Sequence, residues 1–373
     1  MKKYQYFLFA FAALLFMGCE HSEVTKTNKL QFIEKQLWEV TVPDHSDTVP
    51  QKLIDNMDAI FHCSAVRNGN FYGRNLDFFI SDAGEIVVHT PKKGSRYASV
   101  GVGRMNNMTD AELEKGLTDE QLANLAWGMF DGINEEGLFC NMNVVHYGDG
   151  GDNPGTNPGK PNLYNGFLVR ALLDNCATVD EAINFVNNHN IIGKQMSKFN
   201  LHFMIGDPQK TVILEFVDNK AVWVTDAVLP MIMTNFYISK LPQIHRHADG
   251  VERYNILKEH YDEAAQSVDA MYDLMKSVRY SLAYDTTNVP FWKSEYDDLG
   301  YSGYFASMEE LMACQSVRDQ IEHFAHFKKT GEYNRDWALW HTEHVSVYDI
   351  KNKTVTVTVN ENYTPDGKHT FKL

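Results

Sequence analysis

The sequence is poor in cysteine and in basic residues, and each shortage excludes a class of protein. Its 373 residues include five cysteines, with no C-x-x-C pair and no regular spacing, so neither a zinc site nor a disulfide framework is indicated. Lys and Arg total 34 against 49 Asp and Glu, and the net charge of −15 argues against nucleic acid or an anionic membrane surface as the main partner. The Gly-rich stretch 148–159 has no Walker lysine, so it is not a phosphate loop. We expect neither a cofactor nor a metal.

The first nineteen residues indicate export rather than a folded element. Lys2 and Lys3 precede an apolar run over 6–17, which is too short to span a bilayer as a mature helix. The run ends in Gly18-Cys19, which is similar to a bacterial lipobox, with Cys19 as the lipid-bearing residue. We therefore expect a lipoprotein of the bacterial cell envelope, on the periplasmic or surface side, held at the membrane through Cys19. An ordinary cleaved signal is the alternative.

Residues 20–62 form a second region, which we interpret as a tether and a pro-segment. Residues 20–30 are polar and suit a tether. Short apolar runs follow at 30–33 and 37–42, and the stretch 50–61 has helical spacing after a proline. This region should pack on the rest of the chain, and residues 63–373 should form one domain.

Beyond residue 62, groups of expected strands alternate with groups of expected helices. This alternation predicts an α+β domain in which helices cover antiparallel sheets. The expected strands lie at 63–66, 71–80, 86–88, 97–102, 137–145, 201–205, 211–216, 221–224, 231–236, 344–349 and 353–360. The expected helices lie at 119–130, 164–175, 179–188, 250–279 and 308–328.

Cys63 is the strongest candidate for a reactive side chain. An Asn68-Gly69 turn should fold the next strand back beside it, which brings Arg74 and Asp77 close. A thiol needs a base or a cation to become nucleophilic. His62 is adjacent on the strand and should point to the opposite face. If cleavage made Cys63 the first residue, its own α-amine, with a pKa of about 8, could be the base. Taken alone, Arg74 and Asp77 are equally consistent with a structural ion pair.

The surrounding motifs resemble the choloylglycine hydrolase family of N-terminal-nucleophile hydrolases, which includes bile salt hydrolases and penicillin V acylases, with acid ceramidase as a relative. The similar blocks run in family order along most of the chain. They are Cys63-Ser64-Ala65, Tyr72-Gly73-Arg74-Asn75-Leu76-Asp77-Phe78, Asp131-Gly132-Ile133-Asn134-Glu135-Glu136-Gly137-Leu138, Asn141-Met142-Asn143, Leu201-His202-Phe203-Met204-Ile205, Met233-Thr234-Asn235 and Glu252-Arg253-Tyr254. The resemblance implies an αββα sandwich of two antiparallel sheets covered by helices.

The resemblance also implies roles for particular residues. Cys63 would be the nucleophile and its freed α-amine the general base, with Arg74 and Asp77 shaping their surroundings. The other implied site residues are an oxyanion donor, Asn235, a backbone N–H near Asn143, and a supporting arginine, Arg253. Asn141 competes with Asn143 for that position.

The function implied is hydrolysis of a linear amide C–N bond of a hydrophobic N-acyl small molecule through an acyl-cysteine. Freeing Cys63 requires cleavage of the His62–Cys63 bond, for which we expect autoprocessing by Cys63. The alternatives are an acyltransferase that uses the same cysteine and a non-catalytic lipid-anchored binding protein of the same fold. Homo-oligomer formation is left open. Seven aromatic residues are candidates for an acyl pocket: Tyr237, Phe291, Trp292, Tyr296, Tyr301, Tyr304 and Phe305.

Other polar motifs are weaker candidates for a site. His341-Thr342-Glu343-His344 lacks the H-E-x-x-H order of zinc proteases and lies in an alternating stretch, so we interpret it as ordinary polar strand positions. The stretch 148–159 is a candidate lid. The remaining cysteines are expected to be small core residues: Cys140, Cys176 and Cys314.

Overall fold

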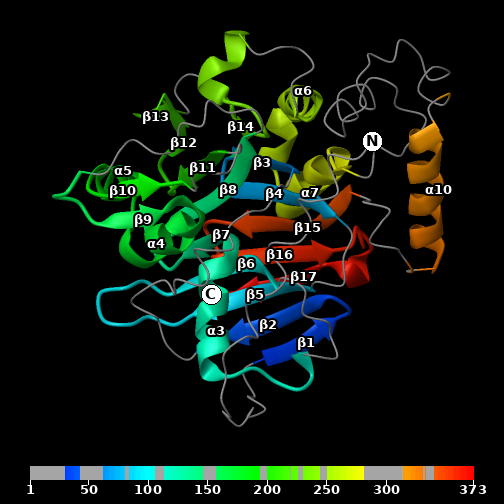
Figure 1. Ribbon diagram of the computed structural model, residues 1–373, viewed down its shortest axis with the longest axis horizontal. Helices are drawn as coiled ribbons and strands as arrows, with labels where there is room; N and C mark the ends of the chain where they lie inside the picture. The colour runs from blue at the N-terminus through cyan, green and yellow to red at the C-terminus, as the bar shows by residue number, and fades with distance from the viewer. Residues whose placement is uncertain are drawn as a thin grey trace.

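The protein folds into two sheets packed face to face, with helices on the outer face of each sheet (Figure 1). In this computed structural model the described residues are 30–42, 62–79, 84–105, 113–145, 157–193, 200–218, 220–225, 230–243, 250–280, 313, 315–330, 332 and 340–373. The expected α+β class, with two largely antiparallel sheets covered by helices, is confirmed. Among the described residues, no helix is long and apolar enough to cross a membrane.

The larger sheet has nine strands. From edge to edge they are β1 (Leu30–Glu34), β2 (Leu37–Thr41), β5 (Gly84–Thr90), β6 (Ser99–Met105), β7 (Met129–Asn134), β8 (Phe139–Val145), β11 (Asn200–Gly206), β12 (Thr211–Val217) and β13 (Lys220–Thr225). Neighbouring strands are antiparallel except β2, which pairs in parallel with β5. Residues 30–42, which precede Cys63, therefore form two strands of this sheet.

The smaller sheet has six strands and carries Cys63. Its order is β14 (Met231–Met233), β3 (His62–Asn68), β4 (Phe71–Phe79), β15 (Trp340–Asp349), β16 (Thr354–Val359) and β17 (His369–Lys372). The predicted hairpin is present, because β3 and β4 are joined through the two-residue turn Gly69–Asn70. The register pairs Cys63 with Leu76 and Ala65 with Arg74.

Helices cover both sheets from outside. The helices α3 (Asp119–Leu125), α4 (Leu168–Asn175) and α5 (Val179–Asn187) pack on the larger sheet, and α6 (Val251–Glu259) and α7 (Val268–Ser277) pack on the smaller one. The helix α10 (Gln315–Thr330) lies at the right-hand edge of the view in Figure 1. A short parallel pair, β9 (Asn162–Tyr164) with β10 (Asn190–Ile192), lies near α4 and α5. Thr178 caps α5 as predicted, because its hydroxyl accepts a hydrogen bond of 3.2 Å from the Glu181 N–H.

Two predicted helices end earlier than expected. The helix expected over 119–130 stops at Leu125, and β7 begins at Met129. The apolar residues Leu122, Leu125 and Met129 continue helical spacing across this boundary, so periodicity could not detect it. The helix expected over 250–279 divides into α6 and α7 because Ser267 caps a new helix, accepting a hydrogen bond of 3.0 Å from the Ala270 N–H.

Candidate active site

Cys63 lies near the start of β3, fully buried, with its side chain directed between the two sheets. Its sulfur is 3.4 Å from Nη2 of Arg74, on the neighbouring strand β4. Leu76 and Val144 pack against it, and the side chains of Phe78, Phe130 and Leu201, which are partly buried, surround this group. The sulfur therefore lies against the Arg74 guanidinium with apolar side chains around it.

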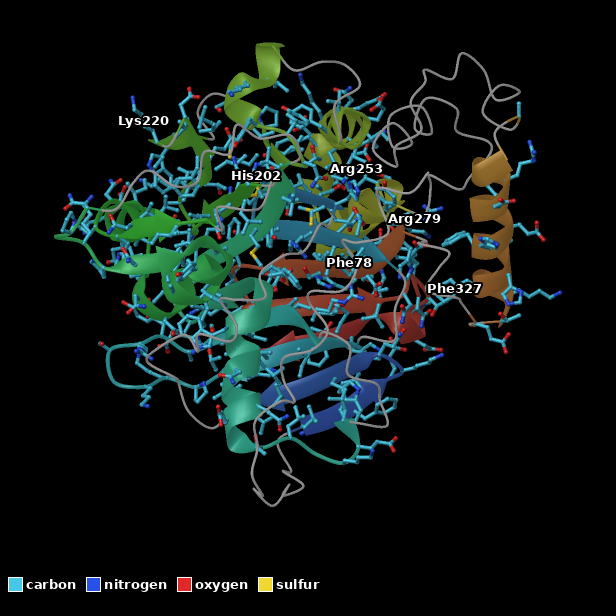
Figure 2. All side chains as sticks on the ribbon, viewed as in Figure 1. Phe78, His202, Lys220, Arg253, Arg279 and Phe327 are labelled. Carbon is cyan, nitrogen blue, oxygen red and sulfur yellow. The ribbon has the colours of Figure 1, made fainter. Side chains whose placement is uncertain are left out.

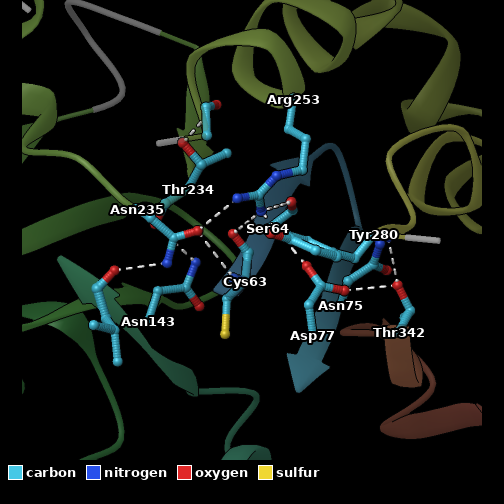
Figure 3. Close-up of polar contacts among 12 residues, drawn as sticks. Cys63, Ser64, Asn75, Asp77, Asn143, Thr234, Asn235, Arg253, Tyr280 and Thr342 are labelled. Atoms are coloured by element: carbon cyan, nitrogen blue, oxygen red, sulfur yellow. Dashed lines mark hydrogen bonds and ion pairs between the residues drawn. The ribbon is translucent and has the colours of Figure 1, made fainter. Parts of the chain in front are cut away.

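The main chain of Cys63 is hydrogen-bonded by residues that lie away from its sulfur (Figure 3). Its N–H donates to Oδ1 of Asn235 over 3.0 Å, and its carbonyl oxygen accepts from Nη1 of Arg253 over 2.8 Å. Nη2 of Arg253 also donates to Oδ1 of Asn235 over 2.8 Å. Asn235 and Arg253 therefore meet at the nitrogen that would become an α-amine, while the sulfur points away from them (Figure 3).

Arg74 and Asp77 have different partners, which disfavours the interpretation that they form an ion pair with each other. Three residues apart on β4, they project to opposite faces of the sheet. Arg74 pairs with Asp131 at 3.2 Å, between the sheets. Asp77 lies 3.5 Å from Nη1 of Arg253, and its Oδ1 accepts a hydrogen bond of 2.6 Å from the hydroxyl of Thr342. Arg74 therefore contacts the Cys63 sulfur, and Asp77 contacts Arg253, the arginine at the Cys63 main chain.

The turn before α6 fixes Arg253 relative to Asn235. Gly250 has φ of +79°, and the Thr234 hydroxyl donates to its carbonyl over 3.0 Å. A Cβ at Gly250 would lie 2.7 Å from the Thr234 Oγ1, too close for any side chain. The close packing here orients the first turn of α6, and with it Arg253, toward Cys63.

The loop that carries Asn235 is also anchored by the larger sheet. Nε2 of His202 lies 2.8 Å from the carbonyl oxygen of Thr234, and the Glu215 carboxylate accepts hydrogen bonds from the N–H groups of Ile238 and Ser239. Both His202 and Arg253 lie deep in the molecule (Figure 2). The position of Asn235 thus depends on both sheets.

Asn143 reaches the same loop, and Asn141 stands behind it. Nδ2 of Asn143 donates to the carbonyl oxygens of Met233 and Thr234, over 3.2 and 3.3 Å. Nδ2 of Asn141 donates to Oδ1 of Asn143 over 3.0 Å. Of the two asparagines, Asn143 is therefore the one that contacts the Asn235 segment.

Sequence reasoning missed a second set of residues, which we call the ionic cluster. It consists of buried charged side chains between the sheets: Arg74, Glu85, Arg104, Asp131, Glu343 and His344. The interpretation of His344 and Glu343 as ordinary strand positions is wrong, because both are buried in this cluster. An alternating pattern does not reveal charged residues that find partners on another sheet. The uncommon density of charge in an otherwise β-branched strand was the available signal.

Burial governs the acidity of the thiol. It raises the pKa of Cys63 to about 12, against the opposing effect of the Arg74 guanidinium. In the uncleaved chain the thiol is therefore protonated at neutral pH. It needs a base at its side to become a nucleophile.

Other predicted features have mixed outcomes. Cys140 and Cys176 are free, buried core residues, as expected, whereas Cys19 and Cys314 lie outside the described residues. Tyr237 is buried and its hydroxyl donates to the Phe216 carbonyl over 3.0 Å, and its place in an acyl pocket stays a prediction. The other six pocket candidates and most of the stretch 148–159 lie outside the described residues. Within the described part of the chain, no group of His, Cys, Asp and Glu could hold a metal ion.

Comparison with known proteins identifies the family. No curated protein matches the sequence. Among solved structures, the chain is similar to penicillin V acylase from Agrobacterium tumefaciens, with a TM-score of 0.46 and 15% identity over 81% of this chain and 83% of that one. A variant of the conjugated bile acid hydrolase from Clostridium perfringens gives a TM-score of 0.42 and 17% identity over 84% of this chain and 92% of that one. The profile of linear amide C–N hydrolases, choloylglycine hydrolase family, matches residues 63–280, which is more than half of the chain. The protein therefore belongs to the choloylglycine hydrolase family of linear amide C–N hydrolases.

Proposed function

We propose that the protein hydrolyses a linear amide of an apolar acyl group, with Cys63 as the nucleophile. The observation that carries this proposal is the placement of Cys63, whose sulfur contacts Arg74 while its nitrogen contacts Asn235 and its carbonyl contacts Arg253. In the uncleaved chain the Cys63 nitrogen occupies the place of the α-amine that cleavage would create.

In the proposed reaction the α-amine of Cys63 takes the thiol proton, and the sulfur attacks the amide carbonyl carbon. The tetrahedral oxyanion is stabilised by Nδ2 of Asn235 and by a backbone N–H near Asn143. The C–N bond breaks, and the leaving amine takes the proton from the α-ammonium. Water, activated by the same amine, then attacks the acyl-cysteine and releases a carboxylic acid and the free thiol.

The apolar acyl group is supported by the residues around the sulfur. Phe78, Phe130 and Leu201 are partly buried and pack on the cluster of Cys63, Leu76 and Val144. An apolar acyl chain against these side chains would bury surface at about 25 cal/mol per Å².

The first step of maturation would be cleavage of the His62–Cys63 bond by Cys63 itself. The thiol attacks the His62 carbonyl, the peptide nitrogen leaves as the new α-amine, and water hydrolyses the resulting thioester. His62 is buried, and its ring lies 4.8 Å from that of Tyr280. The bond therefore lies inside the folded protein, which supports an intramolecular reaction over attack by an external protease.

Replacement of Cys63 by Ala tests the proposal. We expect Cys63→Ala to remain a single chain by intact mass and to hydrolyse no member of a panel of N-acyl amides with apolar acyl groups. The wild type should show two fragments divided between residues 62 and 63, and a burst of product. Cys140→Ala, which removes another buried thiol, is the matched control and should be cleaved and active. Hydrolysis by Cys63→Ala, or by a wild type still joined at 62–63, would sink the proposal.

We further propose that the protein is an exported bacterial envelope lipoprotein anchored through Cys19. The support is the sequence pattern of basic start, short apolar run and Gly18-Cys19. Two anchoring signals are the rule for stable attachment, and lipoprotein modification supplies several acyl chains at one residue. Cys19→Ser should move the protein from the membrane fraction to the soluble fraction. An unchanged distribution would contradict the anchor.

A further inference from the structure

The strand β15 carries an irregularity beside β4, the strand that pairs with the one carrying Cys63. Its register with β4 shifts between Thr342 and His344, so Glu343 is an additional residue on β15. Consecutive side chains of a regular strand point to opposite faces, but a bulge relaxes that alternation. Both Glu343 and His344 accordingly reach the larger sheet. Oε1 of Glu343 lies 3.2 Å from Nη2 of Arg104, and Nδ1 of His344 lies 2.6 Å from Oε2 of Glu85.

The second nitrogen of His344 meets the partners of Arg74. Nε2 of His344 is 3.4 Å from Oδ2 of Asp131, to which a protonated Nε2 donates, and 3.2 Å from Nη1 of Arg74, which is also a donor, so the imidazolium and the guanidinium share Asp131 as acceptor. The same Asp131 oxygen is 3.2 Å from Nη1 of Arg74. The other oxygen of Asp131 accepts hydrogen bonds from the hydroxyls of Ser346, over 3.2 Å, and Tyr348. Both oxygens of Asp131 therefore have partners, and His344 and Arg74 contact the same oxygen, Oδ2.

The far end of Arg74 is the end that touches the nucleophile. Its Nη2 lies 3.4 Å from the Cys63 sulfur and donates to the Met142 carbonyl over 3.2 Å. Arg74 is fully buried. A buried guanidinium whose one side is fixed by Asp131 has little freedom on its other side, so the geometry at Asp131 sets the geometry at the sulfur.

Protonation of His344 balances the charges of the six residues in the ionic cluster. The groups that contact His344 are Glu85 on β5, Asp131 on β7 and Arg74 on β4. Tyr348 contacts Asp131, Arg104 contacts Glu85 and Glu343, and His341 contacts Glu343. Three carboxylates, from Glu85, Asp131 and Glu343, then face three cations, from Arg74, Arg104 and His344. Burial opposes the imidazolium, but Glu85 and Asp131 outweigh it and raise the pKa of His344.

We propose that His344 is a positioning residue of the amidase, and that its imidazolium, held by Glu85, neutralises Asp131 so that Arg74 stays directed at the Cys63 sulfur. The inference rests on the proposed function, because it assigns His344 a role only through Arg74 and the nucleophile. Without the imidazolium, Asp131 and Glu85 would draw Arg74 away from the sulfur, and their uncompensated charge would disfavour a thiolate.

The rate at which iodoacetamide alkylates Cys63, measured from pH 5 to pH 10 on the processed protein, tests the inference without any amide substrate. An opposite charge within about 4–6 Å lowers the pKa of a thiol by roughly 1–3 units, and Arg74 lies 3.4 Å from the Cys63 sulfur. If His344→Gln weakens that contact, the midpoint of the alkylation profile should rise by about one unit. Alkylation at neutral pH should then be about tenfold slower. Because the pKa of His344 is raised, its imidazolium is fully present below the ordinary histidine pKa and is lost as the pH rises through the raised value. Above that pH the alkylation rates of the wild type and His344→Gln should converge.

Matched controls separate positioning from a general loss of structure. His341→Gln removes another buried imidazole from β15, one that lies 3.3 Å from Glu343 rather than at Asp131, and should leave the midpoint where it is in the wild type. His344→Asn keeps a donor toward Glu85 and is the second variant if His344→Gln does not fold; its midpoint should also rise. If neither folds, the ¹⁵N shifts of the wild type decide, since one imidazole should stay doubly protonated after exposed histidines have lost their protons.

The outcomes are distinct from those of the proposed function. A wild type whose Cys63 is alkylated and whose amidase activity is present, with an unchanged midpoint in folded His344→Gln and His344→Asn, overturns the role of His344 alone. A neutral His344 at pH 7 overturns it as well. A wild type in which Cys63 is neither freed nor alkylated overturns the proposed function, and the inference with it.

Discussion

At the scale of single residues, Asn235 connects most of the candidate site. Its Oδ1 accepts from the Cys63 N–H and from Arg253, and its Nδ2 donates to the Val144 carbonyl over 2.8 Å. In the proposed reaction the same Nδ2 would turn to the oxyanion, while Oδ1 would hold the α-amine. One carboxamide would thus position the base and stabilise the charge that the attack creates.

Removal of this carboxamide should therefore affect the chemical step. Loss of one oxyanion donor costs about 100- to 1000-fold in kcat, and we expect that loss for Asn235→Ala, with little change in KM. The matched control is Asn75→Ala, which removes a buried carboxamide that donates to the Met275 carbonyl over 2.9 Å. Each variant should lose about 1–3 kcal/mol of unfolding free energy by thermal denaturation. Equal losses of kcat in the two variants would assign Asn235 a structural role only.

At the scale of elements, the junction between β14 and α6 decides where Arg253 lies. The helix begins at a left-handed Gly250 that packs against Thr234, one residue before Asn235. A first-turn residue of α6 thereby reaches the main chain of Cys63, 190 residues earlier. The contact between Thr234 and Gly250 thus places Asn235 and Arg253 relative to each other.

Gly250→Ala should disturb that turn twice over. A left-handed conformation costs a non-glycine residue about 1–2 kcal/mol, and the overlap with Thr234 adds roughly 1–3 kcal/mol. Gly94→Ala shares the backbone cost, with φ of +60°, but its Cβ would meet nothing within 4 Å. We expect Gly250→Ala to be the less stable of the two in denaturant unfolding and to lose activity through Arg253. Equal stability of the two variants would show that the contact with Thr234 is unimportant.

At the scale of the whole molecule, the segment before Cys63 is part of the fold. The strand β2 pairs with β5, where the Gln36 carbonyl accepts from the Glu85 N–H over 2.8 Å and Glu39 pairs with His89 at 2.7 Å. Leu37 is fully buried. Since β5 also supplies Glu85 to the ionic cluster, the segment supports the strand that carries a partner of His344. Cleavage at 62–63 would leave this pairing intact.

The two fragments of a cleaved protein should therefore remain together. We expect them to co-elute in native gel filtration and, with Cys19 lipidated, to stay on membranes until urea separates them. Leu37→Ala should weaken the association by about 2–5 kcal/mol, seen as separation at lower urea concentration. Phe32→Ala, at an apolar residue 53% exposed, should not. Release of the 63–373 fragment into buffer from the wild type would contradict this.

Much of the site followed from sequence because its geometry is local. The turn at Gly69–Asn70 folds β4 onto β3, so a short hairpin was enough to bring Arg74 beside Cys63. Alternation on β4 also separates Arg74 from Asp77, a consequence of period two that disfavours the alternative of a structural ion pair between them. The order of motifs determined the family, which the match over 63–280 confirms.

The tertiary structure alone decided which partners the charged residues have. Arg74 and His344 are 270 residues apart, and they meet because β15 lies beside β4 and His344 shares with Ser346 the strand face that contacts Asp131 of the other sheet. Periodicity reports which face of a strand a residue occupies, but not which sheet covers that face. Hence the sequence by itself determined the candidate nucleophile, its hairpin and its family, whereas the packing of the two sheets determined that Asp131 and His344 contact Arg74 and that Glu85 contacts His344.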